Sequence, residues 1–154
     1  MSTALIVTGS QTIGPFFKYA ITWRQTAKLF DDAAVVVSGT LFDGQGLPVT
    51  DGFLELWQQR ESQRGGEGFA RVHTDAQGGF VFGCDARPVF VSVFARGLLS
   101  HFSTRLYFAA DEKDTVLKAA GARSATMLAT SSGSNAYRWD VQLGGARETV
   151  FLDL

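Results

Sequence analysis

Histidines and tyrosines, two residue types that can bind metal ions, are sparse in this chain of 154 residues. The candidate ligands are two histidines and three tyrosines: His73, His101, Tyr19, Tyr107 and Tyr137. Together they could in principle hold a hard ferric or zinc ion. No two of them have the i, i+2 or i, i+4 spacing that places side chains next to each other on a strand or a helix. We therefore expect no metal site within the chain, with His73 facing water or a backbone group and His101 half-buried.

Other reactive groups are equally isolated. The single cysteine, Cys84, excludes an internal disulfide, and we expect it to pack as a small apolar side chain rather than act as a nucleophile. Gly9–Gly14 is rich in small residues, but no strand precedes it and no lysine follows, as a phosphate-binding loop would require. The acidic pairs Asp31–Asp32 and Asp111–Glu112 lie in polar segments, where solvation or helix capping explains them.

Composition excludes several classes of function. The chain has 14 basic and 15 acidic side chains, so it lacks the excess positive charge that a nucleic-acid-binding protein uses against phosphates. No basic amphipathic helix indicates a membrane surface, and no apolar segment is long enough to span a bilayer. The N-terminus lacks the basic and apolar parts of a signal peptide, so a cytoplasmic location is expected.

Short segments of β-branched and aromatic residues, separated by glycines, dominate the chain. Their alternation of apolar and polar residues predicts strands with one buried face. These strands are 35–42, 53–57, 69–73, 79–82, 89–96, 137–143 and 149–154, and Arg105 lies in a further strand around 104–107. Turn residues at Asp43–Gly46 and Thr74–Gly79, and later at Ser131–Asn135 and Gly144–Gly145, predict tight reversals. Such spacing favours an antiparallel sandwich over alternating βαβ units.

Only the segment from Asp111 to Thr130 has the composition of a helix. Asp114 is placed to cap its first turn, and Gly121 is expected to divide it into two pieces. The segment from Thr8 to Lys28 has no regular period and contains Gly14-Pro15, which predicts an extended arm. We expect one domain over residues 1–154, with residues 1–30 as an N-terminal interface arm.

Ordered motifs along the chain carry a family resemblance. They are Ser10–Phe17, Gly39–Val49 with Leu54–Gln58, Val93–His101 with Thr104–Phe108, and Glu148–Leu154. Together they resemble the α subunits of the protocatechuate 3,4-dioxygenase family of intradiol ring-cleavage enzymes. The resemblance implies a mainly β fold, an antiparallel β-sandwich of the intradiol dioxygenase type with short helical excursions.

The resemblance also implies a partner and a cofactor. In this family a homologous β subunit holds one non-haem Fe(III) through two histidines and two tyrosines, and the α subunit holds none. The substrates are a small aromatic diol and O₂, and protocatechuate is cleaved to 3-carboxy-cis,cis-muconate. Counted from the matched motifs, the histidine positions fall on Pro88 and Phe90, which cannot bind iron. The tyrosine positions fall within Glu61–Gly66 and Gly83–Arg87, where no tyrosine stands and where the second connection is short.

Two regions could contribute to the partner's active site, as the resemblance implies. The first is Thr12-Ile13-Gly14-Pro15 of the arm, where Pro15 has a fixed φ and Gly14 allows the backbone to approach a flat ring. Thr12 offers a hydroxyl, and the alternative for Thr12 is a plain interface contact. The second is Arg96, whose guanidinium could hold a substrate carboxylate. Its alternative is an ion pair with a carboxylate of the protein.

The sequence thus leaves two functional interpretations. The chain is expected to be the iron-free α-type subunit of an intradiol dioxygenase, inactive alone. Alternatively, it is a non-catalytic β-sandwich paralogue that forms a homo-oligomer or serves as a binding module. Co-purification with an iron-binding chain would separate the two.

Overall fold

Strands make up most of the structure, a computed structural model that describes residues 9, 11–14, 16, 27–59, 65 and 67–153. The helical elements are α2 (Thr115–Ala120) and the 3₁₀ helix η2 (Gly121–Met127). The strands are β1 (Val35–Phe42), β2 (Phe53–Trp57), β3 (Phe69–His73), β4 (Gly79–Cys84), β5 (Val89–Phe94), β6 (Phe102–Leu106), β7 (Thr130–Gly133), β8 (Ala136–Arg138) and β9 (Val141–Gln142).

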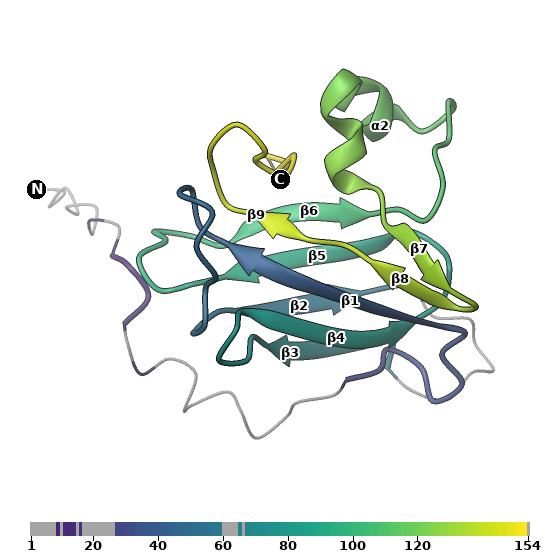
Figure 1. Cartoon of the computed structure of the whole chain (residues 1–154), viewed down its shortest axis with the longest axis horizontal. Coiled ribbons are helices and arrows are strands. Elements are labelled where there is room, and N and C mark those ends of the chain that lie inside the picture. Colours follow the sequence, from purple (N-terminus) through teal and green to yellow (C-terminus); the bar gives the residue numbers. More distant parts are fainter. Residues whose placement is uncertain are drawn as a thin grey trace, which may run out of the picture.

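The strands form two sheets that lie against each other, with α2 outside them (Figure 1). One sheet has the order β4-β1-β8-β7, with β9 also paired to β1, and the other has the order β3-β2-β5-β6. All pairs in the second sheet are antiparallel. In the first sheet, β1 runs parallel to β8 and β9. The predicted antiparallel sandwich is therefore confirmed, with a local parallel pairing that the sequence did not indicate.

Alternation along the strands builds the core between the sheets. In β1, Val35, Val37 and Leu41 are buried, whereas Val36 between them is exposed. In β5 every second residue from Val89 onward is buried, because successive side chains of a strand point to opposite faces. Strand boundaries predicted for β1, β2 and β3 are confirmed, and β5 ends two residues earlier than predicted.

Two aspartates set the turns that fix the strand register. The Asp43 Oδ1 atom accepts hydrogen bonds from the backbone N–H groups of Gln45 (2.9 Å) and Leu47 (2.8 Å). Asp75 does the same for Gln77 (2.8 Å) and Gly79 (2.7 Å). In both turns a glycine three residues after the aspartate has a positive φ, 82° and 73° respectively. Both predicted reversals are confirmed, and their chemistry is that of Asx turns.

The cap and the break predicted for the helical segment are confirmed, although helix covers only residues 115–127 of the predicted 111–130. Asp114 caps α2, since its Oδ1 accepts the N–H groups of Val116 (2.8 Å) and Leu117 (3.0 Å). Gly121 has a φ of 56°, which ends the α-helix, and the chain continues as η2. None of the helices in the described part of the chain is long and apolar enough to cross a membrane.

Predictions for the C-terminal third were partly wrong. The strand predicted over 137–143 is divided at Trp139 and Asp140, because the Asp140 carboxylate accepts the Thr40 N–H (2.8 Å) in place of a backbone carbonyl. The segment predicted as a loop at Ser131–Asn135 instead begins with β7 and turns only at its end, where Asn135 has a φ of 62°. The described part of the predicted last strand forms a single bridge, between Leu152 and Ser103.

Gly39 in β1 provides a test of the packing between β1 and the segment after β8. A Cβ atom at Gly39 would lie 1.8 Å from the Trp139 carbonyl oxygen, which is backbone and cannot rotate away. We predict that Gly39→Ala lowers the free energy of unfolding by about 3 kcal/mol or more. Gly44→Ala is the matched control, since its nearest neighbour would be 3.7 Å away, and it should change stability by less than about 0.5 kcal/mol. Urea unfolding of the two variants measures this, and equal stabilities would contradict the packing described.

Candidate functional site

The two segments predicted to face a substrate lie next to each other. The Ile13 N–H donates a hydrogen bond to the Leu98 carbonyl oxygen (3.3 Å), which places the arm beside the turn that follows Arg96. Figure 1 shows the described arm residues near the connection between β5 and β6. Thr12 and Gly14 are exposed there, so the Thr12 hydroxyl and the Gly14 backbone are accessible from outside the chain. Pro15, the fourth predicted site residue of the arm, lies outside the described residues.

Arg96 stands at the surface of the chain. Its side chain is 62 % exposed, and its Nε lies 3.4 Å from the Asp51 Oδ2 atom. The turn that carries it closes through a hydrogen bond from the Leu98 N–H to the Ala95 carbonyl (3.3 Å), with Gly97 at a φ of 92°. An exposed ion pair of this kind contributes about 0–1 kcal/mol, so it holds the side chain only weakly. The ion pair named as the alternative role is present, and Arg96 can bind a carboxylate strongly only if another molecule covers it.

The positions that correspond to the partner's histidines border a small cavity. Pro88 and Phe90 line a space of about 210 Å³ together with Trp57 and Arg87, and the Phe90 and Trp57 rings lie 5.8 Å apart. Apolar and aromatic side chains thus stand where the resemblance places iron ligands. The residue types present do not fit a ferric ion, which prefers oxygen and imidazole donors.

Gln58 closes this end of the sandwich, and sequence reasoning did not identify its role. Its Nε2 donates to the carbonyl oxygens of Asp85 (3.1 Å) and Arg87 (2.8 Å), and its Oε1 accepts the Asp85 N–H (3.1 Å). The side chain is buried and joins the end of β2 to the connection between β4 and β5. This connection spans only Asp85–Pro88. A buried glutamine has no periodic signal in the sequence that could have revealed it.

The two histidines lie on opposite edges of the same sheet face. His73 on β3 packs against the Phe53 ring, with centroids 5.5 Å apart, and His101 stacks on Phe94 at 5.2 Å. The rings of Phe53 and Phe94 stack between them at 4.4 Å. His101 is exposed, so the prediction that it is half-buried was wrong. Because two phenylalanines separate the histidines, they cannot share a metal ion, and the described residues contain no group of three or more metal-binding side chains.

The remaining candidates have structural surroundings. Cys84 is buried, and burial, with a smaller effect from Asp85, raises the pKa of its thiol to about 12. A thiol with such a pKa is protonated at neutral pH and is not a nucleophile, as expected. The Tyr107 hydroxyl donates to Asp114 Oδ1 (3.1 Å), and burial is the main cause that raises its pKa. The Tyr107 hydroxyl thus contacts the residue that caps α2, which is a structural role.

Similarity to known proteins was found among both sequences and structures. No family model matches the chain. It is 35 % identical to the protocatechuate 3,4-dioxygenase alpha chain of Burkholderia cepacia, over 99 % of this chain and 100 % of that protein. It is 29 % identical to the alpha chain of the same name from Pseudomonas putida, over 95 % and 96 % of the two chains. The alignment with the Burkholderia protein has 196 positions, so at least 42 of them have no residue in this chain of 154.

The solved structures show the fold. The dioxygenase domain of a dioxygenase and carbohydrate-binding fusion protein from Streptomyces sp. SirexAA-E superimposes with a TM-score of 0.57 at 23 % identity, covering 90 % of this chain and 99 % of that one. Hydroxyquinol 1,2-dioxygenase from Pseudomonas putida DLL-E4 gives a TM-score of 0.57 at 15 % identity, covering 88 % and 65 %.

The side chains at Pro88 and Phe90 lead to a prediction about iron. The purified chain alone, incubated with ferric or ferrous salt and desalted, should be colourless and contain far less than one iron per chain, because neither side chain offers a donor atom. Elemental analysis and a visible spectrum measure this. Iron at a near-stoichiometric level, or a tyrosinate-to-iron absorption band, would show that the chain contains a metal site of its own.

Proposed function

The chain belongs to the family of protocatechuate 3,4-dioxygenase alpha chains, and from this membership we propose that it acts as the α-type subunit of an intradiol dioxygenase that converts protocatechuate to 3-carboxy-cis,cis-muconate. The observation that carries the proposal is the match to the Burkholderia protein along the whole length of both chains. The fold shared with hydroxyquinol 1,2-dioxygenase agrees with it. We also propose a cytoplasmic location and a single domain over residues 1–154, with the first 30 residues as an interface arm.

A homologous iron-binding β subunit is the proposed partner. Ring cleavage in this family uses Fe(III), and Pro88 and Phe90 offer no donor atoms for it. The aromatic pair Trp57 and Phe90 and the buried Gln58 line the corresponding region, so this chain would contribute surface and not ligands. The ferric ion, when bound by the partner, would supply the binding site for the two hydroxyl groups of the substrate.

The contribution of this chain is proposed to come from the arm and the Arg96 turn acting together. Thr12, Ile13, Gly14 and Pro15 would form one wall of the partner's pocket, and the Ile13–Leu98 hydrogen bond supports this role because it attaches the arm to the turn. Arg96 would hold the substrate carboxylate once the partner covers it. The weak contact to Asp51 leaves the guanidinium free to exchange one carboxylate for another.

The second candidate function is a non-catalytic sandwich that forms a homo-oligomer. The observation that favours it is the shortened chain, which lacks at least 42 aligned positions of its Burkholderia relative. Co-expression with the iron-binding chain of the same organism separates the two candidates. We expect a stable complex that turns over protocatechuate, and a chain that associates only with itself would support the second candidate.

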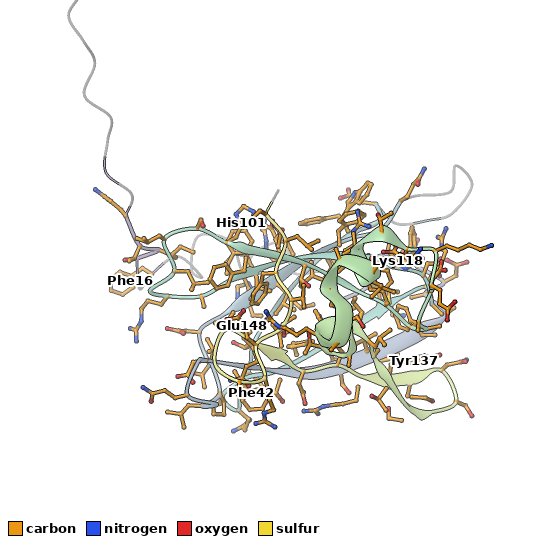
Figure 2. The ribbon with its side chains drawn as sticks, turned by 90° about the horizontal axis from the view of Figure 1, so that it is seen from above. Phe16, Phe42, His101, Lys118, Tyr137 and Glu148 are labelled. Carbon is orange, nitrogen blue, oxygen red and sulfur yellow. The ribbon has the colours of Figure 1, made fainter. Side chains whose placement is uncertain are left out.

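The proposed burial of the arm predicts a change in proteolysis. The Phe16 side chain is 73 % exposed in the isolated chain (Figure 2), and the proposed burial in the complex would remove this apolar surface from water. Trypsin should cleave at Lys18, Arg24 and Lys28 at least about ten-fold more slowly in the complex than in the chain alone. The isolated chain mixed with an unrelated protein at the same concentration serves as control. Equal rates in complex and control would show that the arm is not buried.

The role of Arg96 predicts a difference between two substrates. Arg96→Ala should lower kcat/KM for protocatechuate at least about ten-fold more than kcat/KM for catechol, which has no carboxylate, because a covered guanidinium–carboxylate contact is lost. Arg123→Ala is the matched control, since Arg123 is 57 % exposed and pairs with Glu148 at 2.9 Å. Iron content must be equal in all complexes, because lost metal would resemble lost binding. Equal losses on both substrates would exclude Arg96 from the substrate site.

A further inference from the structure

A second cavity lies away from the arm, between α2 and the C-terminal segment. Figure 1 shows α2 and the C-terminal end side by side on one side of the sandwich, and Figure 2 shows Lys118 and Glu148 on these two neighbouring elements. The cavity measures about 420 Å³, which is within the range of small-molecule pockets. Its walls are mostly apolar and include Val116, Ala119 and Val150, and Arg105 of β6 is its basic group.

Both walls are held by hydrogen bonds. Asp114 caps α2 and accepts the Tyr107 hydroxyl, which ties the helix to the end of β6. The Val150 carbonyl accepts the Thr104 hydroxyl (2.7 Å), and the Val150 N–H donates to the Thr126 hydroxyl (3.1 Å). The C-terminal segment is thus attached to both β6 and η2. The cavity lies between fixed elements, so a ligand would meet a largely preformed site.

Of the described arginines, Arg105 and Arg147 form no ion pair with a carboxylate, and of these two only Arg105 lines this cavity. Five arginines of the described residues pair with a carboxylate: Arg71, Arg87, Arg96, Arg123 and Arg138. Within the same described residues Arg105 has no such pair, and its Nε is buried without a hydrogen-bond partner. Its guanidinium carbon lies 4.2 Å from the centre of the Phe90 ring, which fixes the side chain through a cation–π contact. A cationic side chain with a buried N–H group that has no acceptor favours an anionic ligand.

Two acidic groups near the cavity limit the charge of such a ligand. Asp114 accepts three hydrogen bonds, from Val116, Leu117 and Tyr107, all of them on its Oδ1 atom, and within the described residues it forms no ion pair with Arg105. Asp153 is exposed and lines the cavity. A second negative charge on the ligand would lie in the same small space as the Asp153 carboxylate. The site therefore suits one carboxylate attached to an apolar body.

We propose that this cavity binds aromatic monocarboxylates, with the carboxylate on Arg105 and the ring between α2 and the C-terminal segment. It would be a second site on this chain, independent of the proposed catalytic function and of the partner's iron. Under the proposed function, protocatechuate belongs to this ligand class, whereas its ring-opened product, with more than one carboxylate, does not.

The test is a titration of the full chain, without partner, with 4-fluorobenzoate, followed by ¹⁹F NMR of the ligand. We expect saturable binding with a Kd below about 1 mM. The neutral ligand 4-fluorobenzamide has nearly the same shape and should bind at least about ten-fold more weakly, because it cannot pair with the guanidinium. Arg105→Gln should weaken 4-fluorobenzoate binding by a similar factor, provided that circular dichroism shows a folded chain.

A pair of alanine variants keeps the test independent of Arg105. Ala119 lines the cavity, and Ala119→Phe should fill the space and abolish binding. Ala122 is exposed in η2 and does not line it, so Ala122→Phe should leave binding unchanged. Absence of saturable binding to the unaltered chain, equal affinity for the benzamide, or unchanged binding by Ala119→Phe would each overturn the proposal. None of these outcomes bears on the proposed catalytic role, which requires the partner.

Discussion

The close approach of the Trp139 carbonyl to Gly39 allows β1 to act as the central strand of its sheet. β1 pairs with β4 along one edge and with β8 and then β9 along the other. Between β8 and β9 the chain passes over Gly39, and the Trp139 N–H donates to the Ser38 carbonyl (2.9 Å) while the buried indole Nε1 donates to the Thr126 carbonyl (3.0 Å). This crossing connects the first sheet to η2. The positions of α2 and of the C-terminal segment depend on it, and so does the cavity between them.

The part of the fold that sequence patterns predict is the part governed by local physics. Strands β1, β2 and β3 follow from alternation, because one-sided burial imposes a period of two on the residues. The turns at Asp43 and Asp75 follow from side-chain chemistry that acts over four residues. The parallel pairing of β1 with β8 joins residues about a hundred positions apart, and no local signal reports it. At Asp140 a side-chain carboxylate replaces a backbone acceptor. The alternation of apolar and polar residues continues there, although the predicted strand is interrupted.

In the candidate site, too, the residues in local motifs could be predicted from the sequence, whereas those whose roles depend on distant neighbours could not. Motifs identified the arm and Arg96, and the structure brings Ile13 against Leu98, beside Arg96. The residue types at Pro88 and Phe90 already exclude iron ligands there. Gln58 and Arg105 were missed as site residues because their roles depend on distant neighbours. Gln58 forms hydrogen bonds with residues 27 to 29 positions away in the sequence. Arg105 has no carboxylate partner within the described residues, and this depends on the fold.

Arg96 and Arg105 illustrate how the surroundings of one group determine what it can bind. Water around the exposed Arg96 screens its charge, and Asp51 satisfies part of it, so strong binding of a carboxylate requires a second molecule to remove the water. Arg105 has already lost water at its Nε, and the Phe90 ring and the Tyr107–Asp114 pair hold its surroundings in place. Folding has already removed water from this part of the Arg105 guanidinium. A small anionic ligand can therefore bind to Arg105 without a partner chain. The same guanidinium group therefore suits a site completed by assembly at one end of the sandwich and a preformed site beside α2.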